Sequence, residues 1–179
     1  IPAPSDAFNG TWIFSANGIY DPDFTGVGHQ PSGFDQLIAM YDHFVVIGAK
    51  AIVTFVNNDT SDSMLCGIDV RDSINAESDV RVVIESGTAK YVNLSPRDAG
   101  TNQATVTYSV NPARFLGRSK PLSDPNLKGS AAANPVEQCY FHMFNANLDD
   151  QPSQGTPVTA NVVIEYQVMF IEPKPVGLS

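Results

Sequence analysis

The chain has 179 residues, of which 42% are hydrophobic, and its formal net charge is −9. This length suits one hydrophobic core, so we expect a single domain over residues 1–179. The surplus of acids excludes a surface that clasps a phosphate backbone by bulk electrostatics. The absence of any apolar run of roughly 20 residues predicts no membrane insertion.

The first predicted strand spans residues 10–15, around Trp12. It is followed by the stretch GHQPSGFDQLIAMYDHF, from Gly28 to Phe44. Within this stretch the apolar residues Phe34, Leu37, Ile38 and Tyr41 are spaced i, i+3, i+4 and i+7. That spacing predicts a short amphipathic helix near residues 33–43, in the loop that leads to the next strand.

We also expect particular ends for this helix. Ser32 is placed as its N-cap, and Asp35 three residues later can complete a weak capping box. His43 would then lie in the last turn, where the helix dipole favours a positive charge.

The middle of the chain reads as a series of strands. Residues 45–56 are apolar almost throughout and rich in β-branched side chains, so we expect a strand that is covered on both faces or crosses the middle of a sandwich. Shorter strands are expected at residues 65–71, 80–85 and 90–94. In residues 103–110 apolar and polar side chains alternate, which predicts a half-buried strand.

The connection from Asn111 to Glu137 shows no periodicity, and connections this long are usually functional or ordered by a partner. It is the most basic stretch of an acidic chain. Its basic residues are Arg114, Arg118, Lys120 and Lys128, and its only acids are Asp124 and Glu137.

Two more strands are expected near the C-terminal end, at residues 139–145 and 163–170. In the first, both alternating faces are apolar or aromatic, which indicates a core strand rather than a stacking platform for bases or sugars. The total of about eight strands predicts an all-β fold, a single antiparallel jelly-roll sandwich of two sheets. An immunoglobulin-like sandwich fits less well, because the paired-cysteine spacing is missing.

The histidines invite a catalytic or metal-binding hypothesis. His29 or His43 could act as a base oriented by Asp35 or Asp42, but no GxSxG nucleophile motif accompanies them. A metal site from His29, His43 and His142 lacks HxH or HExxH spacing. We therefore predict no catalytic residues, no metal and no cofactor, and expect the histidines to form hydrogen bonds at loop and strand ends.

Other reactive groups receive similar interpretations. Cys66 and Cys139 are far apart in sequence, and buried free thiols are the expected state, with a disulfide left open. The acid pairs Asp21 with Asp23, Asp59 with Asp62, and Asp149 with Asp150 are expected to be solvated loop acids. Calcium at a subunit contact remains an alternative for them.

Four stretches resemble one protein family. GHQPSGFDQLIAMYDHFVVIGAKAIV resembles a segment of the capsid proteins of circular Rep-encoding single-stranded DNA viruses, the circovirus-like group. NPVEQCYFHMFNA and IEYQVMFIEPK are similar to two of the family's strands, and ARFLGRSKPLSDPNLKGSAAANP to its long connection. The residues that carry the first resemblance are His29, Gln30, Pro31, Phe34, Asp35, Tyr41, Asp42 and His43.

This resemblance implies a structural role, in which the chain self-assembles into a small icosahedral T=1 shell of about 60 copies around single-stranded DNA. It implies localisation in the virion, with assembly in the host nucleus. The family's basic N-terminal arm is missing, since the first Lys or Arg is Lys50, and we expect an arm upstream of this chain.

The resemblance leaves some partners open. DNA contacts on the chain itself are expected at Arg114, Arg118 and Lys120. The host receptor or glycan is not identified. The alternative function is a carbohydrate- or ligand-binding jelly-roll recognition module.

Overall fold

The structure is a computed structural model that describes residues 10–26, 28–77, 79–148 and 158–175. Its strands are β1 (Gly10–Ser15), β2 (Tyr41–Asn57), β3 (Met64–Arg71), β4 (Lys90–Leu94), β5 (Gln103–Val110), β6 (Tyr140–Asn147) and β7 (Val158–Pro173). Its helices are α1 (Phe34–Ile38), α2 (Val80–Glu85) and α3 (Pro112–Phe115), with short 3-10 turns at Pro121–Ser123 and Pro125–Leu127. No helix among these residues is long and apolar enough to cross a membrane.

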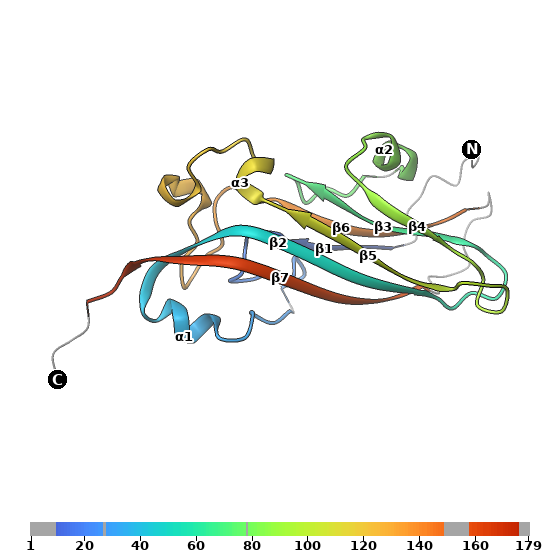
Figure 1. The fold of residues 1–179 in the computed structure, drawn as a ribbon, viewed down its shortest axis with the longest axis horizontal. Coiled ribbons are helices and arrows are strands. Elements are labelled where there is room, and N and C mark those ends of the chain that lie inside the picture. The colour runs from blue at the N-terminus through green and yellow to red at the C-terminus, as the bar shows by residue number, and fades with distance from the viewer. Residues whose placement is uncertain (1–9, 27, 78, 149–157, 176–179) are drawn as a thin grey trace. The chain divides into compact units, whose positions relative to one another are not determined.

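The strands form two antiparallel sheets, with the orders β1-β6-β3-β4 and β5-β2-β7 (Figure 1). Three neighbouring pairs, β1 with β6, β2 with β5, and β3 with β4, join strands whose numbers add to seven. A ribbon of antiparallel pairs rolled up in this way is a jelly roll. The prediction of an all-β jelly-roll sandwich is confirmed, with seven strands in the described part of the chain where we expected eight.

The chain divides into two compact units. The first comprises Ile1–Trp12, Ala51–Tyr108 and Phe141–Ile164, and the second Ile13–Lys50, Ser109–Tyr140 and Glu165–Ser179. In the first unit, the rings of Tyr108 on β5 and Phe141 on β6 lie 6.4 Å apart. In the second, the Tyr166 hydroxyl on β7 donates to the Ser15 carbonyl on β1 over 2.7 Å. Residues of both sheets therefore face each other within each unit, and the single domain over 1–179 stays a prediction.

Residues 80–85 form helix α2, so the strand predicted there is wrong. The Asp79 carboxylate accepts a hydrogen bond from the Arg81 amide and caps the helix. Val80 and Val83, three residues apart, are buried in a cluster with Leu65 and Phe144. The β-branched composition suggested a strand, but capping and packing at helical spacing outweigh that preference.

Helix α1 forms where a helix was expected but is shorter and begins differently. Gly33, at φ 85°, is its N-cap and makes no side-chain capping bond, so the Ser32 cap is wrong. Phe34 and Ile38 are buried one turn apart, whereas Leu37 is 42% exposed. Tyr41 and His43 belong to β2, because only two residues separate the end of the helix at Ile38 from the beginning of the strand.

Two strands test the predictions of covered faces. Every residue of β6 from Phe141 to Asn147 is buried, which confirms a core strand covered on both faces. In β2, by contrast, burial alternates from Ala49 onward, and Ile52, Thr54 and Val56 are half-buried. Two covered faces for residues 45–56 are therefore wrong beyond Val46, and β2 instead runs as the middle strand of its sheet, between β5 and β7.

Candidate functional site

The residues that carry the family resemblance have mixed exposure. His29, Asp35 and Asp42 are exposed, while Gln30 and Pro31 are half-buried in the loop before α1. Phe34 is buried, and its ring meets the buried Phe44 ring edge-to-face at 5.5 Å. This pair holds α1 against the beginning of β2.

His43 and Lys128 both contact the carboxylate of Glu172, and we call these three residues the Glu172 cluster. His43 Nδ1 lies 2.6 Å from Oε2, and Lys128 Nζ donates to Oε1. Lys128 and His43 lower the pKa of the Glu172 carboxyl, in that order of effect. Glu172 has φ 60°, the left-handed region that side chains rarely adopt. The cluster ties together the start of β2, the end of β7 and the long connection.

Further contacts join the same segments of the second unit. The Tyr41 and Phe170 rings are 5.8 Å apart. The Lys174 amide donates to the Met40 carbonyl over 2.9 Å, and its ammonium donates to the Ile38 carbonyl over 3.1 Å. The stretch from Gly28 to Phe44 is therefore in direct contact with the terminal stretch IEYQVMFIEPK.

The long connection reaches the same place through a backbone bridge. Phe44 and Gly129 exchange two hydrogen bonds, each 2.9 Å long. A Cβ at Gly129 would overlap the Phe44 ring, so only glycine allows this approach. Three of the four resemblance stretches thus meet around the end of α1 and the beginning of β2.

The catalytic and metal hypotheses find no matching geometry in the described residues. The carboxylate beside His43 is Glu172, rather than Asp35 or Asp42. His142 belongs to the first unit, while His29 and His43 belong to the second. Among the residues that the structure describes, no group of three or more His, Cys, Asp or Glu side chains could hold a metal ion.

His142 sits in a buried polar cluster that the sequence did not reveal. Its Nε2 lies 2.7 Å from the Ser73 carbonyl, and its buried Nδ1 has no hydrogen-bond partner. Burial lowers the pKa of His142. Nearby, the buried Asp69 accepts hydrogen bonds from Arg71 Nε and the Thr88 hydroxyl, each with a donor–acceptor distance of 2.6 Å. The side-chain types are visible in the sequence, but their burial and convergence are not.

The three residues expected to contact DNA differ in their surroundings. Arg118 donates to the Glu137 carboxylate and lies 3.4 Å from Asp124, so its charge is balanced within the long connection. Arg114 and Lys120 are exposed. The structure therefore leaves Arg114 and Lys120 as better candidates for an anionic partner than Arg118, and the contact itself stays a prediction.

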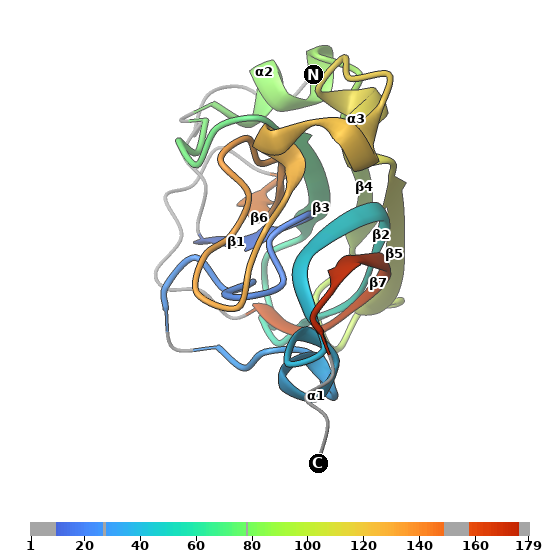
Figure 2. The ribbon, with the colours of Figure 1, turned by 90° about the vertical axis from the view of Figure 1, so that its left-hand side faces the viewer.

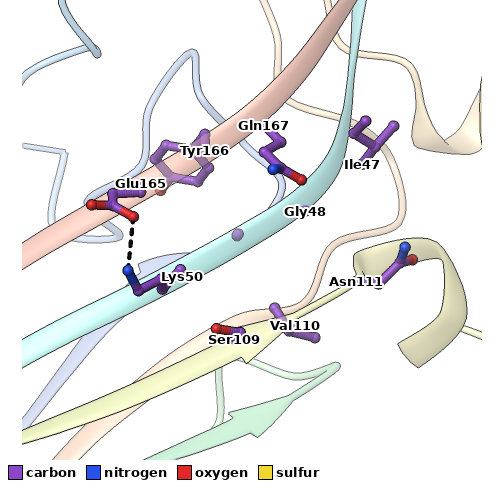
Figure 3. A pocket seen from close by; sticks show the side chains of 10 residues that line it. Ile47, Gly48, Lys50, Ser109, Val110, Asn111, Glu165, Tyr166 and Gln167 are labelled. Atoms are coloured by element: carbon purple, nitrogen blue, oxygen red, sulfur yellow. Dashed lines mark hydrogen bonds and ion pairs between the residues drawn. The ribbon is translucent and has the colours of Figure 1, made fainter.

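The outer face of the β5-β2-β7 sheet carries an open groove of about 470 Å³ in the second unit (Figure 3). Lys50 Nζ and Glu165 Oε2 form an ion pair in this groove at a distance of 3.1 Å, which Figure 3 marks with a dashed line. Gln167 lies over Gly48, where an added Cβ would meet its Oε1 at 2.9 Å. The one aromatic residue that lines it, Tyr166, directs its hydroxyl to Ser15. The groove combines polar side chains with the apolar Ile47, Ala49 and Val110, and it offers no exposed ring on which a sugar could stack.

The cysteines and the loop acids have structural roles. Cys66 and Cys139 are free and buried, as expected, and burial raises the pKa of both thiols to about 12. Asp23 accepts hydrogen bonds from Thr25, and Asp59 accepts them from the amides of Ser61 and Asp62. The predicted pair Asp149 and Asp150 lies outside the described residues.

No protein-family model and no curated protein sequence matches this chain. Among solved structures, it is similar to a semi-empty VLP of the prawn nodavirus of Macrobrachium rosenbergii, with 14% identity over 99% of this chain and 89% of the other, at TM-score 0.47. The chain is also similar to a structure of Desmodium yellow mottle tymovirus, with 10% identity over 98% of this chain and 85% of the other, at TM-score 0.46. A structure of tobacco necrosis virus has 17% identity over 96% of this chain and 91% of the other, at TM-score 0.45. Similarity at this level does not assign a function, so the function is inferred below from the residues of the chain.

Proposed function

We propose that this chain is the coat-protein subunit of a circovirus-like single-stranded DNA virus, and that about 60 copies assemble into a T=1 icosahedral shell. The observation that carries the proposal is that the stretches resembling this family are each other's contact partners. His43 with Glu172 and Tyr41 with Phe170 join the first stretch to the last. Phe44 with Gly129 joins the first to the long connection.

Such contacts favour a structural role for these residues over a chemical one. A catalytic histidine needs a substrate within reach, whereas His43 and Lys128 are both engaged with one carboxylate at the junction of three segments. Phe34 and Phe44 contribute buried aromatic packing at the same junction. Residues that hold a scaffold together in this way suit a subunit whose surface loops contact neighbouring copies.

The genome is a further part of the proposal. With a formal charge of −9, the chain needs added positive charge to neutralise DNA phosphates. We assign that role to a basic arm upstream of Ile1, with a smaller contribution from Arg114 and Lys120. The virion is then its final location, and assembly around DNA takes place in the host nucleus.

Electron microscopy and light scattering of the purified chain at neutral pH test the proposal. We expect discrete closed shells with a mass near 60 subunits, and a dependence on concentration typical of assembly. A chain that stays monomeric at high protein concentration would argue against a coat protein. Binding to immobilised glycans by such a monomer would favour the recognition module instead.

A further inference from the structure

A smaller pocket, of about 240 Å³, lies between the segment after β1 and the segment that leads into β6. The two segments lie side by side in Figure 2, and the Ala16 amide donates to the Cys139 carbonyl at 2.8 Å. Every residue that lines the pocket is described and belongs to the second unit. Around it stand Asp21, Asp23, Phe24, Asn134, Gln138 and Tyr140.

Hydrogen bonds fix the frame of this pocket. Asn134 Oδ1 accepts from the Asp21 amide at 3.3 Å, and Asn134 Nδ2 donates to the Asp21 carbonyl at 2.9 Å. The Ser15 hydroxyl donates to Gln138 Oε1 at 2.9 Å. Gly18 packs directly against both amides, because a Cβ there would come within 2.6 Å of Asn134 Cγ and Gln138 Oε1. The pocket is therefore pre-formed, and a ligand need not order these side chains.

Several polar groups on this frame are left for a ligand. The Asp21 carboxylate and the Tyr140 hydroxyl have no hydrogen-bond partner in the described part of the chain. Asp23 accepts both bonds from Thr25 through Oδ1, which leaves its Oδ2 free. Gln138 uses its Oε1, so its Nε2 can still donate. The pocket thus offers acceptors and donors together.

An exposed ring borders the same pocket. Phe24 is 53% exposed, although a side chain of this type normally gains free energy by burial. Tyr140 is half-buried and supplies a second ring. Aromatic faces beside a few placed polar groups suit a small ligand that has one apolar face and a polar edge. A sugar ring has this form, with C–H bonds on its faces and hydroxyl groups around its edge.

The charge of the lining selects among sugars. Asp21 and Asp23 line the pocket, and no lysine, arginine or histidine does. Two carboxylates repel phosphate, sulfate and the carboxylate of an acidic sugar. A metal ion is a poorer fit, because no group of three or more His, Cys, Asp or Glu side chains in the described ranges could hold one.

We propose that this pocket binds one ring of an uncharged sugar. Phe24 packs against the C–H face of the ring, and Asp21 and Gln138 hydrogen-bond its hydroxyl groups. The inference goes beyond the proposed function and stands without it. On a coat protein, such a site suits attachment to uncharged glycans.

Saturation-transfer NMR of the purified chain in EDTA tests the proposal. The probes are the methyl glycosides of glucose, galactose, mannose and N-acetylglucosamine, and at least one of them should bind. The methyl glycoside of N-acetylneuraminic acid carries a carboxylate and should not bind. Absence of binding by all four neutral probes overturns the proposal, as does equal binding of the acidic one. Binding that appears only after calcium is added also overturns it, because the pocket is then a cation site.

Variants locate the binding in this pocket. Phe24→Ala should weaken the affinity about fivefold and Asp21→Ala about tenfold, and neither side chain is needed for folding, since both are exposed. Phe115→Ala and Asp35→Ala are the matched controls, because they change an exposed ring and an exposed carboxylate that do not line the pocket. Both should bind as the parent does. An unchanged affinity in Phe24→Ala and Asp21→Ala overturns the assignment.

The outcomes separate the pocket from the proposed function. Shells that form from a chain without sugar binding overturn the pocket and leave the coat-protein proposal standing. Sugar binding that is lost in Phe24→Ala, by a chain that never forms shells, does the reverse.

Discussion

His43 Nδ1 and Glu172 Oε2 lie 2.6 Å apart, although 129 positions separate the two residues in the sequence. The contact joins the beginning of β2 to the end of β7, and Lys128 adds the long connection to the same carboxylate. Glu172 is 46% exposed, so water screens the cluster and each pair alone contributes little. Its role is to hold together three segments that meet at one place.

The Glu172 cluster predicts a stability difference that depends on pH. Lys128 and His43 lower the pKa of Glu172 from 4.5, so their stabilisation is complete above pH 4.5 and is lost as the pH falls through the lowered pKa. Glu172→Gln should therefore have a lower melting temperature than the parent chain at pH 7, and this difference should shrink as the pH falls below 4.5. Glu85→Gln, which changes an exposed carboxyl of α2, is the control and should follow the parent across this pH range.

His142 predicts a loss of stability in mild acid. The Ser73 carbonyl can only accept, so Nε2 carries the proton and the orphaned Nδ1 must take up the second one. Burial lowers the pKa of His142 below 6.5, so its stabilisation is present above pH 6.5 and is lost as the pH falls from there through the lowered pKa.

Urea unfolding of His142→Gln measures this effect. Its amide can still donate to Ser73 but does not titrate, so the variant should lose less unfolding free energy than the parent between pH 7.5 and 5. His29→Gln changes an exposed histidine and should retain the parent's slope. Equal slopes for the parent and His142→Gln would show that His142 does not titrate in this range.

The packing of helix α2 predicts that two neighbouring valines contribute unequally to the free energy of unfolding. Val83 is buried and Val82 is 46% exposed, so Val83→Ala should cost about 2 kcal/mol of unfolding free energy and Val82→Ala less than about 0.5 kcal/mol. A strand at residues 80–85 would instead place positions 80, 82 and 84 on one face. A larger cost at Val82 than at Val83 would support the strand.

The long connection predicts that its arginines act differently. Removing Arg114 and Lys120 together should weaken the salt dependence of single-stranded DNA binding. The slope of log K against log salt concentration should fall in magnitude by about 1 to 2, with little change in melting temperature. Arg118→Ala should lower the melting temperature instead, because it leaves the carboxylates of Glu137 and Asp124 without their positively charged partner. Unchanged salt dependence in the double variant would exclude these two residues from the DNA contact.

Local patterns were sufficient where polar and apolar side chains alternate along one strand. Residues 103–110 and 163–170 were predicted as strands because polar and apolar side chains follow each other with a period of two. The buried state of Cys66 and Cys139 was also predictable, since free thiols behave as small apolar side chains. These features depend on residue type and on near neighbours in the sequence, so they can be predicted from the sequence alone.

The sequence by itself thus determined the all-β class, most strand positions and the absence of a nucleophile motif. Tertiary structure alone decided that residues 80–85 are helical, because Val80 and Val83 gain more by packing on Leu65 and Phe144 than their strand preference is worth. It also decided that His43 pairs with Glu172 rather than with Asp42, and that His142 is buried beside Ser73. Such partners come from distant parts of the chain, and their distances depend on how the sheets roll up.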